Sequence, residues 1–223
     1  MPNSICENID RIRQQIPPST RLIVVSKQAS VAQIRIAYST GIRDFAENRL
    51  QDATFKQEQL QDLSDICWHF IGHIQSKKAK KIITQFSWIH SVDSLDLAQR
   101  LDRLSAELSL SPKACLQVKI LEDPNKYGWH PTELLRDLPP LDSLKHLQIN
   151  GLMTILPLGL SEEEALSAFE KLRSLANEIK QQTQFSLKMT ELSMGMSGDY
   201  TLAVRAGATM IRPGRIIFNS RYL

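Results

Sequence analysis

A lysine at the end of an apolar run is the residue of this sequence best suited to covalent chemistry. Lys27 follows the run LIVVS, and a segment with helical spacing begins shortly afterwards at Val31. Burial and nearby cations lower the pKa of a lysine and free its amine to form a Schiff base with a carbonyl compound. A lysine that extends from a strand end into solvent fits the same position, and position alone favours this second interpretation.

Two glycine-containing loops near the carboxyl end of the chain have the composition of phosphate-binding loops. The first, residues 192–200 (LSMGMSGDY), is rich in glycine and serine. Such loops let backbone amides surround a phosphate at the start of a helix, although Ser197 could instead cap that helix. The second, residues 211–215 (IRPGR), allows close backbone approach at Gly214 and offers a permanent cation at Arg212.

Short apolar runs alternate along the chain with longer segments of helical spacing. Eight of the runs have the character of buried strands and lie at residues 22–27, 44–48, 69–72, 89–92, 115–120, 149–155, 189–193 and 209–212. Alternating strands and helices predict a parallel sheet. Eight such units predict an α/β fold, a single (β/α)8 TIM-barrel domain over residues 1–223. An open doubly wound sheet is the alternative that the strand count disfavours.

Helices are predicted between these strands, and one has a complete start signal. Ser161 and Glu164 have capping-box spacing at the start of a predicted helix over residues 161–180. Its apolar residues recur on one face, which is typical of a helix that packs on a sheet. An opening helix is predicted over residues 3–15 and another over residues 31–38.

In such a barrel the active site lies at the carboxyl ends of the strands. These ends hold a ring of polar side chains: Lys27, Asn48, His73, Ser91, Lys119, Thr154, Ser193 and Arg212. Each one alone fits a strand that simply reaches solvent, but together they have the polarity that a site requires. The two glycine loops follow the seventh and eighth predicted strands, where barrels frequently bind phosphate.

Composition and charge exclude several classes of protein. The 223 residues include 27 Lys and Arg against 24 Asp and Glu, and the formal charge of +3 is too small to indicate a nucleic-acid partner. No apolar run approaches the roughly 20 residues of a membrane helix, and the first residues are too polar for a signal peptide. Cys6, Cys67 and Cys115 are widely spaced, which indicates reduced thiols in a cytoplasmic protein.

Two further clusters are interpreted as structural. The basic run KKAKK at residues 77–81 is favoured as the solvated face of a helix that turns Ile82 and Ile83 inward, although it could contact phosphates or an acidic partner. His69 and His73 are four residues apart, but an expected strand-to-loop context removes the helical geometry of a zinc pair. No metal site is predicted.

Several longer segments resemble the pyridoxal 5′-phosphate (PLP) homeostasis protein family, in order along nearly the whole chain. The matching segments are VVSK (24–27), FAEN (45–48), WHFIGHIQSKK (68–78), HSVDS (90–94), QVKILEDPNKYG (117–128), GLMTILP (151–157), ELSMGMSGDY (191–200) and GATMIRPG (207–214). The resemblance implies the barrel of the fold-type III PLP proteins, like the N-terminal domain of alanine racemase. This agrees with the eight-unit prediction.

The resemblance also implies which residues bind PLP as a cofactor. Lys27 would hold PLP covalently as an aldimine, and the other cofactor-binding residues would be Asn48, Met153, Ser193, Gly195, Met196, Arg212, Gly214 and Arg215. Among them, Arg212 would face the pyridine nitrogen, while Ser193 and the backbone near Gly214 and Arg215 would hold the phosphate. Arg215 replaces a small hydroxyl residue often found in the family, so a backbone contact is expected there.

These expectations favour a binding protein over an enzyme. An arginine at the pyridine nitrogen stays protonated and leaves the ring a weak electron sink, and no tyrosine of the sequence can be placed as the second acid/base group that racemisation needs. We expect a monomer that holds PLP reversibly, serves intracellular PLP homeostasis and amino and keto acid balance, and meets apo-enzymes or a regulatory protein. The alternatives are a weak PLP-dependent amino-acid racemase and a phosphate-ester-binding barrel without PLP chemistry.

Overall fold

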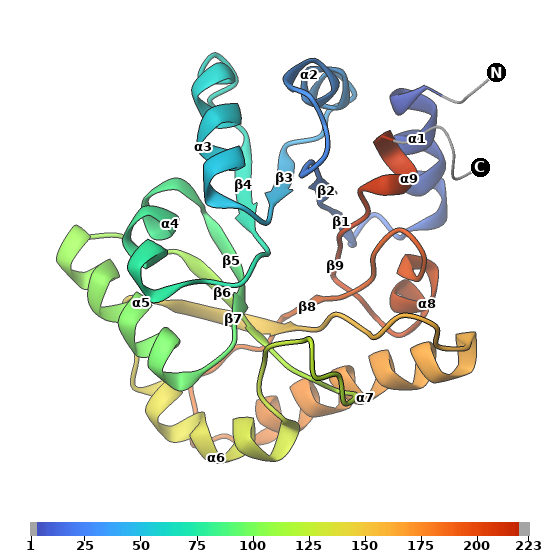
Figure 1. Cartoon of the computed structure of the whole chain (residues 1–223). Helices are drawn as coiled ribbons and strands as arrows, with labels where there is room; N and C mark the ends of the chain where they lie inside the picture. Colours follow the sequence, from blue (N-terminus) through green and yellow to red (C-terminus); the bar gives the residue numbers. More distant parts are fainter. Residues whose placement is uncertain (1–3, 219–223) are drawn as a thin grey trace.

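A computed structural model describes residues 4–218, which form a parallel sheet curled into a barrel with helices around it (Figure 1). The strands are β1 (Arg21–Leu22), β2 (Val24–Val25), β3 (Asp44–Glu47), β4 (Cys67–Phe70), β5 (Trp88–Val92), β6 (Lys113–Gln117), β7 (Gln148–Met153), β8 (Glu191–Ser193) and β9 (Met210–Ile211). Their order is β1-β9-β8-β7-β6-β5-β4-β3-β2. The prediction of a parallel α/β barrel is confirmed.

The barrel closes through one extended stretch of chain that contains both β1 and β2. β1 pairs with β9 and β2 pairs with β3, and only Ile23 separates the two segments. The Ile23 amide donates to the Ile211 carbonyl at 2.9 Å, whereas the Ser26 amide donates to the Ala46 carbonyl at 3.0 Å. The extended stretch predicted as a strand over residues 22–27 therefore bonds to β9 on one side and to β3 on the other.

The helices lie outside this sheet. They are α1 (Ile5–Gln15), α2 (Val31–Ser39), α3 (Leu50–Gln59), α4 (Ala79–Gln85), α5 (Leu95–Leu108), α6 (Pro131–Asp142), α7 (Glu162–Gln181), α8 (Tyr200–Arg205) and α9 (Arg215–Phe218), with a 3-10 turn η1 (Ser76–Lys78) before α4. The predicted capping box at Ser161 is present at the start of α7. The predicted start of the first helix at Asn3 lies outside the described residues, and α1 is capped by Ser4.

Apolar side chains pack on both faces of the sheet. A small cluster fills the barrel interior and comprises Ile23, Val25, Ala46, Trp88, Cys115, Met153 and Met210. A larger cluster lies between the strands and the surrounding helices, because successive strand residues point to opposite faces. Phe169, Leu172, Leu175 and Ile179 of α7 are all buried in it. Burying each such side chain contributes roughly 1.5–3 kcal/mol.

The basic run at residues 77–81 lies on the outer surface, as predicted. Ile82 and Ile83 of α4 are buried, while Lys77, Lys80 and Lys81 are exposed. Within residues 4–218, none of the helices has the length and apolar character needed to cross a membrane.

Candidate functional site

Lys27 lies at the carboxyl mouth of the barrel, two residues after the end of β2, and its side chain is exposed. Asn48 follows β3, the neighbouring strand, and is half-buried. Because β2 and β3 are parallel and paired, their ends deliver both residues to the same edge of the sheet. The structure therefore brings together the first two predicted site residues.

A buried ion pair holds these two strand ends in place. Lys56 of α3 donates from Nζ to Glu47 Oε1 and to the Ser26 carbonyl, both at 2.7 Å. The Ser26 hydroxyl donates to the same Glu47 Oε1 at 2.7 Å. Ser26 precedes Lys27 and Glu47 precedes Asn48, so this group fixes the backbone from which both side chains project. Sequence reasoning missed it, although a glutamate inside the run DFAE was its signal.

The loop after β8 and the start of α9 form a cradle for an oxygen acceptor. The Ser197 hydroxyl oxygen accepts from the amides of Gly214 and Ile216, at 3.1 and 3.3 Å. Two backbone N–H groups thus point at one oxygen, which is the arrangement that binds a phosphate oxygen. This donor set fits a phosphate group.

Glycines allow this cradle to form. Gly195 has φ +90°, and an added Cβ would lie 2.6 Å from the Ala203 Cβ. A Cβ on Gly214 would lie 2.7 Å from the Val25 carbonyl oxygen. Asp199 shapes the turn between them, because its Oδ1 accepts from the Met196 amide at 2.6 Å.

Arg212 is a fixed cation inside the barrel mouth. It is 2% exposed and donates from Nη1 to the Ser193 hydroxyl at 2.5 Å and from Nη2 to the Thr154 carbonyl at 2.8 Å. Burial lowers the pKa of Arg212 to about 10, so the guanidinium is still charged near neutral pH. Met153 is fully buried in the interior cluster.

The two serines of the glycine loop have different surroundings. Ser193 is completely buried and bonds to His90 and Arg212. Ser197 instead lies at the backbone amides of the cradle. The structure thus places a hydroxyl at the cradle, but it is that of Ser197. Of the remaining predicted residues, Met196 is half-buried and Arg215 is exposed.

His69 and His73 do not point to a common metal position. His69 lies inside the barrel and bonds to Asp44 and His90. His73 bonds instead to Asp93 through Nδ1 at 3.0 Å. A different set, Asp44, Cys67 and His69, has ligand atoms within 4.8 Å of one another. The positive charges of Arg21 and Lys113 act on both Cys67 and His69, and they oppose a metal ion there.

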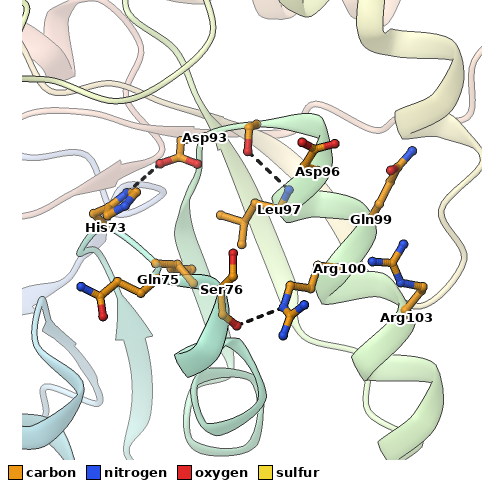
Figure 2. A pocket seen from close by; sticks show the side chains of 11 residues that line it. His73, Gln75, Ser76, Asp93, Asp96, Leu97, Gln99, Arg100 and Arg103 are labelled. Atoms are coloured by element: carbon orange, nitrogen blue, oxygen red, sulfur yellow. Dashed lines mark hydrogen bonds and ion pairs between the residues drawn. The ribbon is translucent and has the colours of Figure 1, made fainter.

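A polar pocket of about 550 Å³ lies beside the mouth (Figure 2), and neither Lys27 nor the residues of the cradle line it. It is formed by the segment after β4 and the first turns of α5. His73 and Asp93 form one wall, and Arg100 bonds to the Ser76 carbonyl at the other (Figure 2). The pocket contains none of the predicted cofactor-binding residues.

Comparison with known proteins agrees with this geometry. The family model described as "Alanine racemase, N-terminal domain" matches residues 2–221. A pyridoxal phosphate homeostasis protein of Synechocystis is 54% identical over 206 residues, which cover 92% of this chain and 94% of the relative.

Solved structures give the same result. PipY of Synechococcus elongatus, solved without PLP, matches with a TM-score of 0.94 and 52% identity, over 97% of this chain and 100% of PipY. The PLP-bound form of PipY matches with a TM-score of 0.93 and 51% identity over the same shares of the two chains. Alanine racemase of Clostridium difficile shares the fold at 14% identity, with a TM-score of 0.77, over 96% of this chain and 56% of the racemase.

The geometry and the similarity therefore agree: this chain belongs to the pyridoxal phosphate homeostasis protein family, and its barrel has the fold of the N-terminal domain of alanine racemase.

Proposed function

We propose that this chain binds PLP reversibly at the carboxyl mouth of the barrel and serves PLP homeostasis without catalytic turnover. The observation that carries the proposal is the convergence of three groups on neighbouring strands. These groups are the exposed amine of Lys27 after β2, the amide cradle at Ser197 and Gly214, and the buried cation of Arg212 after β9. PLP carries an aldehyde, a phosphate and a basic ring nitrogen, and each has a matching partner in this set.

Each residue has a distinct proposed role. PLP supplies an aldehyde that condenses reversibly with an amine, and Lys27 provides the amine, with loss of water, to form the aldimine. We assign the phosphate to the backbone near Gly214 and to the hydroxyl of Ser197 in place of Ser193, because Ser193 is buried and engaged with Arg212. The other members of the proposed site are Asn48, Met153, Gly195, Met196 and, through its backbone, Arg215.

The site lacks features that a racemase uses. Arg212 has only donors to offer the ring nitrogen, so the ring is left without the positive charge that stabilises a carbanion. Racemisation also needs an acid/base group on each face of the substrate. The described tyrosines are engaged elsewhere: Tyr38 donates to Asp65, Tyr200 bonds to Gln15, and Tyr127 stacks on His73.

We further propose that the protein is a cytoplasmic monomer. In this role it contributes to amino and keto acid balance by releasing PLP to apo-enzymes or by contacting a regulatory protein. The exposed position of Lys27 supports exchange, because water or another amine can reach the bond that releases the aldehyde.

The test is the visible spectrum of the protein with added PLP, before and after borohydride. Wild type is expected to show an aldimine band that borohydride abolishes, and Lys27→Ala is expected to lack the band. Lys119→Ala is the matched control, because Lys119 is another lysine at a strand end. Turnover of a D- or L-amino acid by wild type that is lost in Lys27→Ala would favour a racemase. Phosphate-ester binding that is equal in both proteins, with no aldimine band in either, would favour a barrel without PLP chemistry.

A further inference from the structure

A hydrogen-bonded chain of polar side chains, all buried except the partly exposed Asp44, crosses the barrel interior from one mouth to the other. Asp44 Oδ1 lies 2.9 Å from His69 Nε2, and His69 Nδ1 lies 2.9 Å from His90 Nε2. His90 Nδ1 lies 2.7 Å from Ser193 Oγ, which accepts from Arg212 Nη1. Asp44 begins β3 at the amino mouth, whereas Arg212 follows β9 at the carboxyl mouth. The cluster therefore links the two ends of the barrel.

The chemistry of the two end groups, Arg212 and Asp44, requires every hydrogen bond in the chain to be donated in the same direction. Arginine has only donors and an ionised carboxylate has only acceptors, so Arg212 donates to Ser193 and His69 donates to Asp44. Burial lowers the pKa of His69 and lowers that of His90 further, so each imidazole is neutral and has one N–H. His90 must then donate from Nε2 to His69, and the Ser193 hydroxyl must donate to His90.

Every hydrogen bond in the chain therefore points from the Arg212 cation to the Asp44 carboxylate. His69, His90 and Ser193 are each 0% exposed, so bulk water does not compete for the bonds among these three side chains, and solvent reaches only the Asp44 end, where the side chain is 25% exposed. In the low-dielectric interior, bonds aligned in this way polarise one another. The hydrogen-bonded chain thus connects the buried guanidinium of Arg212 to a counter-charge at the opposite mouth, the carboxylate of Asp44.

The surroundings hold the two imidazoles in this arrangement. The His69 ring stacks on Trp88 with the ring planes 10° apart and the centroids 5.9 Å apart. At the amino mouth, the cations of Arg21 and Lys113 lie over the same indole, each 5.4 Å from its centroid. These cations disfavour a second proton on His69. Cys67 of β4 and Glu191, which begins β8, are further titratable groups at this end.

We propose that Asp44, His69 and His90 are positioning residues for Arg212, so that the amino mouth of the barrel sets the strength with which the carboxyl mouth holds PLP. This inference rests on the proposed PLP site. The hydrogen-bonded chain acts through Ser193, whose hydroxyl accepts a hydrogen bond from Arg212 and donates one to His90. A change at Asp44, on the opposite mouth, is expected to reach the cofactor.

The experiment measures PLP dissociation constants and the visible spectrum of bound PLP in Asp44→Asn and His69→Phe. Asp44→Asn retains an oxygen acceptor for His69 and removes only the charge, so binding is expected to weaken about fivefold. His69→Phe can still stack on Trp88 but interrupts the chain, and a weakening of roughly tenfold or more is expected. In both variants the absorption maximum of bound PLP is expected to shift, which a loss of general stability would not cause.

The structure offers a matched control in a second aspartate–histidine pair. Asp93 bonds to His73 but has no connection to Arg212, so Asp93→Asn is expected to leave affinity and spectrum unchanged. In the double variant with His69→Phe, Asp44→Asn is expected to have no further effect, because its only route to Arg212 is already broken. If His69→Phe does not fold, Asp44→Asn alone decides.

The outcomes separate the two proposals. Wild-type protein that binds no PLP would remove the proposed function itself. If wild type binds PLP and Asp44→Asn has the same affinity and spectrum, the proposed positioning role of Asp44, His69 and His90 is overturned, while the proposed PLP site remains. An effect of Asp93→Asn as large as that of Asp44→Asn would also overturn it.

Discussion

Replacing Lys56 with methionine should destabilise the fold strongly and loosen the strand ends that hold Lys27 and Asn48. The ammonium group of Lys56 bonds to Glu47 Oε1 and to the Ser26 carbonyl. Its side chain is 9% exposed and that of Glu47 is 0% exposed. Glu47 Oε2 already lacks a hydrogen-bond partner. The variant therefore leaves a buried carboxylate with the Ser26 hydroxyl alone.

The expected loss in the free energy of unfolding is about 3–5 kcal/mol, the usual cost of removing one partner from a buried pair. Solvent screening reduces this figure only slightly, because the Lys56 side chain is 9% exposed and that of Glu47 is 0% exposed. Replacing both residues, with Glu47→Gln and Lys56→Met together, removes the uncompensated charge. The double variant should therefore regain roughly half of the loss or more.

Urea denaturation at neutral pH measures these free energies. Lys80→Met is the control, because Lys80 is an exposed lysine on the neighbouring helix α4, and its loss should cost less than about 0.5 kcal/mol. A Lys56→Met variant within about 1 kcal/mol of wild type would refute the reasoning, as would a double variant less stable than Lys56→Met alone.

Three further predictions follow from the same contacts. Gly195→Ala should weaken PLP binding and lower stability, because an added Cβ would lie 2.6 Å from Ala203 at a backbone φ of +90°; titration with PLP checks this, and unchanged affinity would contradict it. Burial holds the pKa of His69 and His90 below 6.5, so the unfolded chain gains protons first as the pH falls. The contribution of these histidines to stability should be constant well above pH 6.5 and should fall below it by up to about 1.4 kcal/mol per pH unit for each histidine, with a shallower slope in His69→Phe. Burial also raises the pKa of the Cys115 thiol, so iodoacetamide should modify it only after urea is added, as read by mass spectrometry.

The sequence was informative wherever a local pattern determines the structure. The apolar runs predicted the strands, and the capping box at Ser161 predicted the start of α7. The positions of Lys27 at a strand end and of Gly214 in a loop were readable from the sequence, whereas the role proposed for Lys27 came from the family resemblance. The barrel followed from the number of strand–helix units.

Features that depend on register across the barrel could not be read from the sequence. The pairing of the first extended stretch with both β9 and β3 arises only when the sheet closes on itself. Likewise, sequence gives no sign that Ser193 points inward to His90 while Ser197 reaches the cradle. The Glu47–Lys56 pair joins a strand to a helix through side-chain length, and no spacing rule predicts it.

Lys27 is the amine proposed to hold PLP. The most direct measurement is to incubate the protein with PLP, reduce it with borohydride, digest it and identify the modified peptide by mass spectrometry. Stoichiometric phosphopyridoxyl modification of Lys27 is expected in wild type and in Lys119→Ala, and its loss is expected in Lys27→Ala. Modification spread over exposed lysines such as those at residues 77–81, with Lys27 unmodified, would rule out Lys27 as the PLP-binding amine.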